Sequence, residues 1–146
     1  MRMQAKKLNH VAESRRAQGL LDTSVIIDLE KIDRVKLPID IAVSAITMAE
    51  LAAGPFATTD VDERARRQDR LQRAEAIFDP LPFDIEAARA YGRIYAAVAN
   101  SGRKARGARA VDLLIAATAC ALGLPLFTRN PDDFKGLEKL VEVIPV

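Results

Sequence analysis

The sequence predicts an α/β protein, a three-layer α/β/α sandwich around a mostly parallel central sheet. Short apolar or β-branched segments, typical of buried strands, lie at 19–22, 41–47, 124–130 and 141–146. Charged or amphipathic helical segments separate them, at 62–78, 84–102 and 110–123. Strands that alternate with helices favour a parallel sheet covered on both faces. A chain of 146 residues, 49% of them hydrophobic, is long enough for one domain with its own core.

The first half of the chain alternates strands with short helices. After the strand at 19–22 we expect a helix at 23–31, with Thr23 or Ser24 as its N-cap residue. The strand at 41–47 leads into a helix at 48–54, which a Gly-Pro pair ends.

The second half follows the same pattern. A brief strand is expected at 81–83, before the helix at 84–102. The apolar face of that helix is predicted from its periodicity as Ala88, Tyr91, Tyr95 and Val98. Gly123 is the expected C-cap of the helix at 110–123.

Residues 1–18 are polar and basic, without an apolar stripe, and we expect a disordered extension before a domain at 19–146. No apolar run approaches the roughly 20 residues of a membrane span, and no apolar segment follows the basic start as in a signal peptide. The single cysteine, Cys120, suits a reducing compartment. We therefore expect a cytoplasmic protein without membrane contact.

Composition excludes several kinds of site. The only histidine, His10, lies in the polar N-terminal segment, which argues against Ser-His-Asp catalysis and His/Cys zinc sites. The chain has no P-loop and no glycine-rich dinucleotide motif. Its net charge of +2 means that any affinity for nucleic acid depends on how basic residues cluster. If the protein is an enzyme, its carboxylates must carry the chemistry.

Acidic residues follow successive predicted strands. Asp22 ends the first, Glu50 lies just past the second, Asp112 opens a late helix, and Asp132 and Asp133 follow the strand at 124–130. Ligands of open α/β sheets bind beyond the carboxyl ends of the strands, so these acids are expected at one edge. Carboxylates that close together repel one another unless a cation neutralises them. Oxygen ligands select Mg²⁺ or Mn²⁺.

Each acid also has a structural alternative. Asp22 is suited to be a helix N-cap, and Glu50 stands at capping-box spacing from Thr47. Asp112 near a helix start would complement the helix dipole, and aspartate is common in turns such as that around Asp132. The shared position of the acids after successive strands favours a common site.

Four segments carry a family resemblance: "LLDTSVII" at 20–27, "VSAITMAEL" at 43–51, "VDLLIAATA" at 111–119 and "LFTRNPDDF" at 126–134. In order and spacing they resemble PIN-domain proteins of the VapC class, the toxin ribonucleases of bacterial type II toxin–antitoxin pairs. The resemblance implies Asp22, Glu50 and Asp112 as catalytic acids, with Asp22 and Asp112 as the principal magnesium ligands. The family's fourth acid corresponds to Asn130 here, so Asp132, or failing that Asp133, would supply its charge.

The resemblance also implies a mechanism. Mg²⁺ would activate a water for in-line attack on an RNA phosphodiester, leaving a 5′-phosphate, while Glu50 and Asp132 orient that water or a second ion. Hydrogen-bonding partners for the acids are expected among Thr23, Ser24, Thr128 and Asn130.

RNA binding requires positive charge near the acids. A basic loop before Asp112 offers Arg103, Lys104, Arg106 and Arg109 for phosphate contacts, with a solvated loop as the alternative. The helix at 62–78 contains five further arginines, which could extend this track or pair with neighbouring acids: Arg64, Arg66, Arg67, Arg70 and Arg73.

The resemblance implies two protein partners, a second copy of the chain and a VapB-type antitoxin. The main alternative to a nuclease is a catalytically inactive PIN-like module that binds RNA or protein. A haloacid-type phosphatase needs a second aspartate two residues after Asp22, where this chain has Ser24. A receiver domain needs an early acidic pair and a late lysine, and the sequence provides neither at those places.

Overall fold

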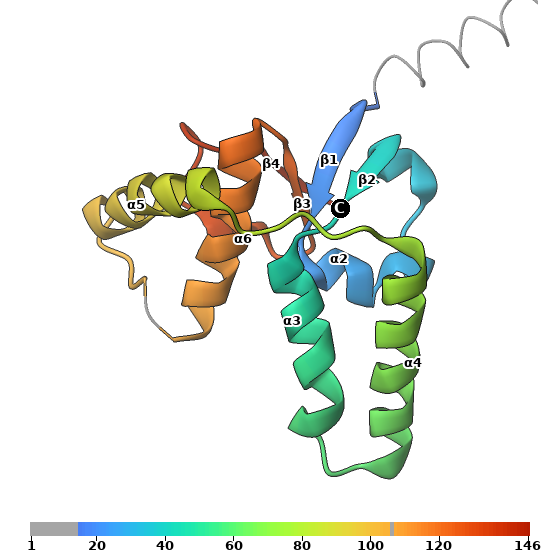
Figure 1. Cartoon of the computed structure of the whole chain (residues 1–146). Helices are drawn as coiled ribbons and strands as arrows, with labels where there is room; N and C mark the ends of the chain where they lie inside the picture. Colours follow the sequence, from blue (N-terminus) through green and yellow to red (C-terminus); the bar gives the residue numbers. More distant parts are fainter. Residues whose placement is uncertain (1–14, 106) are drawn as a thin grey trace, which may run out of the picture.

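The computed structural model describes residues 15–105 and 107–146 (Figure 1). Its sheet has four strands in the order β2-β1-β3-β4, and all neighbours are parallel. The strands are β1 (Gln18–Leu21), β2 (Asp40–Ala42), β3 (Leu126–Thr128) and β4 (Val143–Pro145). The prediction of a mostly parallel central sheet is therefore confirmed.

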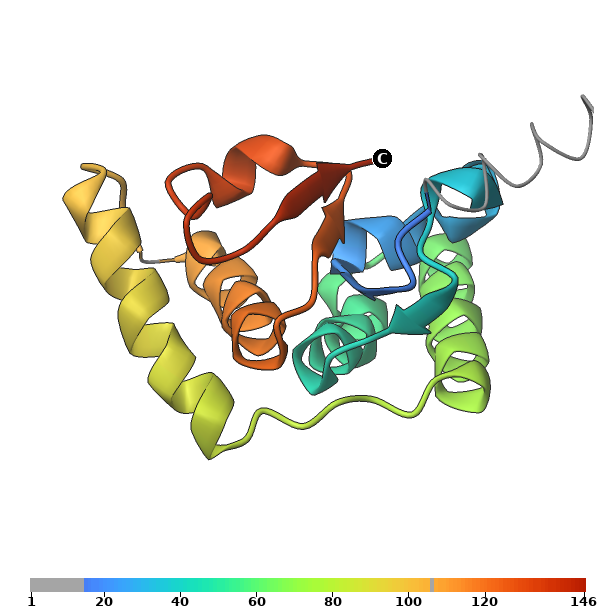
Figure 2. The ribbon, with the colours of Figure 1, turned by 90° about the horizontal axis from the view of Figure 1, so that it is seen from above.

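Helices cover both faces of this sheet. Its helices are α2 (Thr23–Ile27), α3 (Ala45–Ala53), α4 (Val61–Ile77), α5 (Ile85–Asn100) and α6 (Ala108–Leu122). Figure 2 shows α5 and α6 on one side of the strands and α3 and α4 on the other, which makes three layers. Short 3-10 turns complete the fold at η1 (Leu29–Lys31), η2 (Arg34–Lys36), η3 (Gly54–Ala57) and η4 (Pro131–Phe134).

The two central strands separate two hydrophobic cores. Leu20 pairs in register with Leu126, and both are buried on the side of α5 and α6. Leu21 and Phe127, the next pair, are buried on the side of α2, α3 and α4. Successive side chains of a strand point to opposite faces, so each pair of neighbouring residues supplies both cores.

Gly19 in β1 lets the Phe127 ring of the neighbouring strand β3 pack close to the backbone. A Cβ atom at this position would lie 2.3 Å from Cε2 of the buried Phe127 ring, a distance that atoms do not tolerate. The absence of a side chain at residue 19 is therefore a packing requirement of the sheet.

The second predicted strand is wrong in its extent. The strand β2 stops at Ala42, and Ser44 caps α3 by accepting a hydrogen bond from the Thr47 amide at 3.1 Å. The brief strand expected at 81–83 is a single parallel bridge between Leu81 and Ser44. The cap of Ser44 therefore begins the helix where the β-branched residues alone predicted strand.

The predicted face of α5 is right at Val98, which is buried, and at Tyr91, which packs against the core, but wrong at Ala88 and Tyr95, which are exposed. The helix buries Ala87, Ala90, Ile94 and Val98, whereas Tyr95 is 42% exposed. Gly123 ends α6 with a φ of 65°, as expected of a C-cap glycine.

Residues 15–17 lie against the start of the sheet. Arg15 Nε donates to the Leu37 carbonyl at 3.2 Å, and the Arg16 carbonyl accepts from the Ile39 amide at 3.0 Å. The rest of the predicted extension, residues 1–14, lies outside the described residues. Within the described parts of the chain, no helix is long and apolar enough to cross a membrane.

Candidate active site

Asp22 follows β1, where the strand order reverses between β2 on one side and β3 on the other. Its side chain is buried, with 4% exposed. Ser24 Oγ donates to Asp22 Oδ2 at 2.7 Å, and Thr128 Oγ1 donates to the same oxygen at 2.9 Å. Asp22 holds the N-cap position of α2, but its side chain makes no capping hydrogen bond. The carboxylate is thus held by hydroxyl groups from α2 and β3.

The expected roles of Thr23 and Ser24 as N-cap residues are wrong. Both residues lie inside α2, and their hydroxyl groups turn to the acids. Thr23 Oγ1 donates to Glu50 Oε1 at 2.6 Å. Glu50 is half-buried in α3, and the N-cap of that helix is Ser44. A capping box between Thr47 and Glu50 is therefore excluded.

A chain of buried hydroxyl groups leads to Glu50. Thr47 Oγ1 lies 3.0 Å from Thr23 Oγ1, and Ser44 Oγ lies 3.4 Å from Thr47 Oγ1. Each hydroxyl has one proton to donate. Because Thr23 gives its proton to Glu50, it must accept from Thr47, which in turn accepts from Ser44. All the hydroxyl protons of the chain therefore point toward Oε1 of Glu50.

Asp112 lies in the second turn of α6, and the charges of the other acids act on its carboxyl group. Burial, and then the charges of Asp22, Asp133 and Glu50, raise the pKa of Asp112 to about 7, while Arg109 acts in the opposite direction. Four acids from different parts of the fold therefore share one electrostatic environment. The alternative of a dipole-complementing acid in the first turn of α6 does not hold, since that turn has no acidic residue.

The two candidates for the fourth acid differ in their surroundings. Asp132 has an 80% exposed side chain and pairs with Lys135 Nζ at 3.2 Å. Asp133 is half-buried in η4, and its charge acts on Asp112. Asn130 contributes its backbone amide, which donates to Thr128 Oγ1 at 3.0 Å.

These acids suit a hard cation by their chemistry, because all of them offer oxygen ligands. Among the described residues, no three His, Cys, Asp or Glu side chains are close enough together to hold a metal ion as they stand. The carboxylates act on one another through their charges without forming a closed ligand set. Neutralisation of this repulsion is what a bound cation would contribute.

Of the predicted RNA-binding residues, Arg103 and Lys104 lie between α5 and α6, whereas Arg109, which was expected in the loop, lies in the first turn of α6. Arg109 acts on Asp112, and is half-buried. Arg103 instead acts on Glu138, whose pKa is lowered first by the Gly136 amide and also by this arginine. Lys104 is exposed, and Arg106 lies outside the described residues. Among the described members of the predicted set, Arg109 is thus the residue whose charge acts on the acids.

Sequence reasoning did not find Arg129. Its Nε lies 3.3 Å from Asp28 Oδ2, its Nη1 donates to the Val146 carbonyl at 3.2 Å, and its amide donates to Ser24 Oγ at 3.1 Å. It therefore fixes the end of β3 against α2, beside the two hydroxyl groups that hold Asp22. All three partners are distant in the sequence, so no local pattern signals this role.

Comparison with known proteins identifies a family and several relatives that match most of this chain. The PIN domain family model matches residues 19–140. Ribonuclease VapC5 of Mycobacterium tuberculosis is 39% identical over 135 residues, which cover 89% of this chain and 96% of that protein. Ribonuclease VapC of Rickettsia bellii is 33% identical, with 87% of this chain and 95% of that protein covered.

Solved structures give the same result. One is the crystal structure of VapBC-5 from Mycobacterium tuberculosis, a member of the VapBC family of toxin-antitoxin systems. It matches at 39% identity and a TM-score of 0.78, over 89% of this chain and 99% of that one. FitAcB from Neisseria gonorrhoeae matches at 27% identity and a TM-score of 0.64, over 86% of this chain and 95% of that one.

Proposed function

The chain belongs to the PIN-domain family, in its VapC-type branch, and on that premise we propose that it is a toxin of a type II toxin–antitoxin pair, a Mg²⁺-dependent endoribonuclease. The observation that supports this most directly is the effect of Asp22, Asp133 and Glu50 on Asp112. Acids whose charges act on one carboxyl group at the carboxyl edge of a parallel sheet are suited to bind a divalent cation and a phosphodiester.

Asp22 and Asp112 are the proposed ligands of Mg²⁺, which Mn²⁺ could replace. Both hydroxyl groups that hold Asp22 use Oδ2, and no described residue donates a hydrogen bond to Oδ1. That oxygen is therefore available for a cation. A bound divalent ion would supply charge neutralisation for the phosphodiester and would ease deprotonation of the attacking water.

Glu50 would orient the attacking water, because the hydroxyl chain from Thr23 holds its carboxyl group in place. The fourth acid was expected at Asp132 or Asp133. We propose Asp133, since its charge acts on Asp112, whereas the carboxylate of Asp132 pairs with Lys135. Attack by water leaves a 5′-phosphate on the product.

RNA phosphates near the acids would be held by the basic loop of Arg103, Lys104, Arg106 and Arg109. Among the described residues of this set, Arg109 is the one whose charge acts on Asp112. The proposed protein partners are a VapB-type antitoxin and a second copy of the chain, and the proposed location is the cytoplasm. The similarity to VapBC toxin-antitoxin complexes supports the antitoxin partner.

The test is expression of the protein with and without Asp22→Asn, with growth and the 5′-phosphate ends of cellular RNA as readouts. Asp79→Asn, which changes an exposed acid after α4, is the control with equal loss of charge. We expect growth arrest and new RNA ends from the unchanged protein and from the control, and neither from Asp22→Asn. Folded wild-type protein that causes no arrest and no new ends would favour the inactive binding module.

A further inference from the structure

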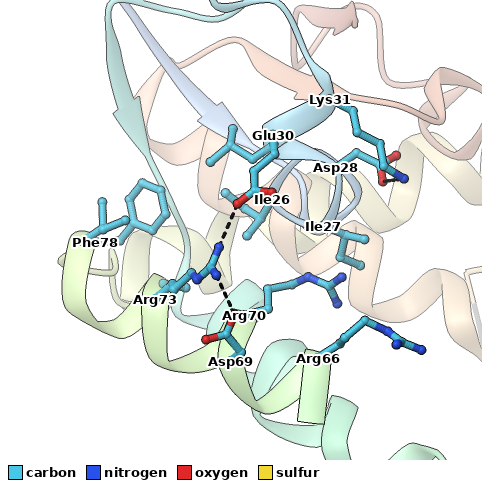
Figure 3. Close-up of a pocket in the computed structure, with 13 residues that line it drawn as sticks. Ile26, Ile27, Asp28, Glu30, Lys31, Arg66, Asp69, Arg70, Arg73 and Phe78 are labelled. Atoms are coloured by element: carbon cyan, nitrogen blue, oxygen red, sulfur yellow. Dashed lines mark hydrogen bonds and ion pairs between the residues drawn. The ribbon is translucent and has the colours of Figure 1, made fainter. Parts of the chain in front are cut away.

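A cavity lies beside Glu50, between α2–α3 and the arginine-bearing helix α4. It has a volume of about 330 Å³, and its wall includes Thr23 and Glu50 on one side and Arg67 and Arg70 on the other. A second cavity of about 470 Å³ continues between α2–η1 and α4, as Figure 3 shows. Ile27 and Arg70 line both cavities. Arg70 therefore stands where one cavity meets the other, next to a proposed catalytic acid.

Four of the five arginines of α4 are engaged within the protein. Arg64 donates to the carbonyl groups of Pro55 and Thr58. Arg66 and Arg67 both bind Glu63, and the hydrogen bonds from Arg67 and then Arg66 lower the pKa of that carboxyl. The partners of these three guanidinium groups all lie in α4 or in the segment just before it.

The fourth, Arg73, contacts Glu30 at 2.8 Å and Asp69 at 2.9 Å. Arg70 differs from all four, because no described residue accepts a hydrogen bond from it or forms an ion pair with it. It is half-buried, and Figure 3 shows its side chain reaching toward Ile27, away from the Arg73–Glu30 pair. A half-buried guanidinium without a protein partner is suited to bind an anion from outside.

We propose that Arg70 binds a backbone phosphate of the RNA strand on the side of the cleavage site toward α4. This inference rests on the proposed nuclease function. The planar fork of an arginine binds two phosphate oxygens at once. The 46% exposed side chain of Ile27 next to it offers an apolar surface for a sugar or base. A strand cleaved beside Glu50 would enter this cavity with its next phosphate groups, because the cavity begins at that acid.

A protein carboxylate is the other anion that could bind Arg70. The position of the cavity favours RNA, since a strand bound at the acids already lies at its entrance. The arginine is a binding residue in this view. It contributes to affinity for RNA and to the placing of the strand, and it takes no part in bond cleavage.

The experiment measures binding of a short fluorescent single-stranded RNA of mixed sequence to the full chain in EDTA, so that cleavage does not interfere. Arg70→Gln is compared with Arg66→Gln and Arg73→Gln, which lose the same charge from the same helix. We expect Arg70→Gln to weaken binding about tenfold and to reduce the slope of log K against log salt by about one. The two controls should change the affinity less than about twofold. Arg70→Lys should recover only part of the loss, because it keeps the charge without the fork.

Two results would overturn the inference while leaving the nuclease proposal intact. One is equal weakening by all three glutamine variants, which would indicate a diffuse positive field. The other is wild-type RNA affinity for Arg70→Gln, including the case in which this variant loses an acidic protein partner. Wild-type protein that neither binds nor cleaves RNA would overturn both proposals together. Circular dichroism of each variant checks that the fold is kept.

Discussion

The charges of the candidate site affect the titration of Asp112. Burial and three neighbouring carboxylates raise its pKa from 3.8 to about 7, so near neutral pH the metal-free site holds a proton there about half of the time. A cation that binds to this carboxylate must displace the proton. Metal affinity should therefore increase as the pH rises through 7.

The same shift predicts how stability depends on pH. Below about pH 4, Asp112 is protonated in both the folded and the unfolded protein. Between about pH 4 and 7 only the folded state keeps the proton, so its contribution to the free energy of unfolding falls as the pH rises. Without metal, Asp112→Asn should be more stable than wild type at pH 8, by on the order of 1–3 kcal/mol after allowance for solvent screening.

Urea unfolding in EDTA at pH 4, 6 and 8 measures this effect. The difference between Asp112→Asn and wild type should vanish at pH 4. Asp132→Asn serves as the control, because its carboxylate is exposed and should give little difference at any pH. An advantage of Asp112→Asn that is equally large at pH 4 would contradict the prediction.

Asp132 and Asp133 form a natural pair for mutation. Asp133→Asn should reduce RNA cleavage by at least about tenfold, since it removes a charge that acts on Asp112. Asp132→Asn should leave cleavage within about twofold of wild type, because it removes only an exposed pair with Lys135. Initial rates with saturating Mg²⁺ decide between them, and the reverse order would assign the fourth acid to Asp132.

At the scale of elements, the hydroxyl chain joins α3 to α2. Thr47→Val keeps the shape of the side chain but leaves Thr23 without its donor. We expect it to lower the free energy of unfolding by about 1–3 kcal/mol and to slow cleavage, as Glu50 loses its support. Thr47→Ser restores the hydroxyl and should recover the rate of cleavage. If the valine variant is destabilised but cleaves at the wild-type rate, Thr47 is structural only.

Two glycines test how closely the elements pack. Gly19→Ala should destabilise the protein by about 1–3 kcal/mol, because the new Cβ would meet the Phe127 ring at 2.3 Å. Gly92→Ala, in the middle of α5, meets nothing within 4 Å and should stabilise by about 0.5–1 kcal/mol. Denaturant midpoints measure both changes, and equal shifts in the same direction would contradict this account.

The order and type of most elements were predictable, because apolar strands and periodic helices alternate along the chain. The limits of β2 were not, since Ser44 begins a helix within a β-branched segment by accepting from the Thr47 amide. The buried face of α5 was misplaced at Ala88 and Tyr95, because alanines occupy most of the turns of this helix and an alanine fits either face. Tertiary packing against α6 decides which of them are buried.

The candidate site was predictable in its acids but not in their supports. Asp22, Glu50 and Asp112 follow from their places after strands and in the family motifs. The partners that fix them are hydroxyl groups from other elements, such as Thr128 for Asp22 and Thr47 for Thr23. Contacts of this kind depend on how the layers pack, which the sequence does not display.

At the scale of the whole molecule, metal binding should raise the free energy of unfolding. A ligand that binds only the folded state at a hundredfold excess over its Kd adds about 2.7 kcal/mol, or on the order of 5–10 °C in Tm for a chain of this size. We expect Mg²⁺ or Mn²⁺ to raise the Tm of wild type and of Asp79→Asn, and to leave Asp22→Asn unchanged. Thermal scans with and without EDTA measure this, and an equal rise in all three proteins would indicate a nonspecific ion effect.

The two cores of the molecule divide the acids between them. Asp22 and Glu50 belong to elements that pack on the side of α2, α3 and α4, whereas Asp112 and Asp133 belong to α6 and η4 on the other side. A cation shared by the four would cross-link the two halves of the protein. Amide hydrogen exchange should then slow in both helical layers when the metal binds. A large-to-small substitution in either core should lower the affinity for the metal, although the substituted residue does not contact the ion.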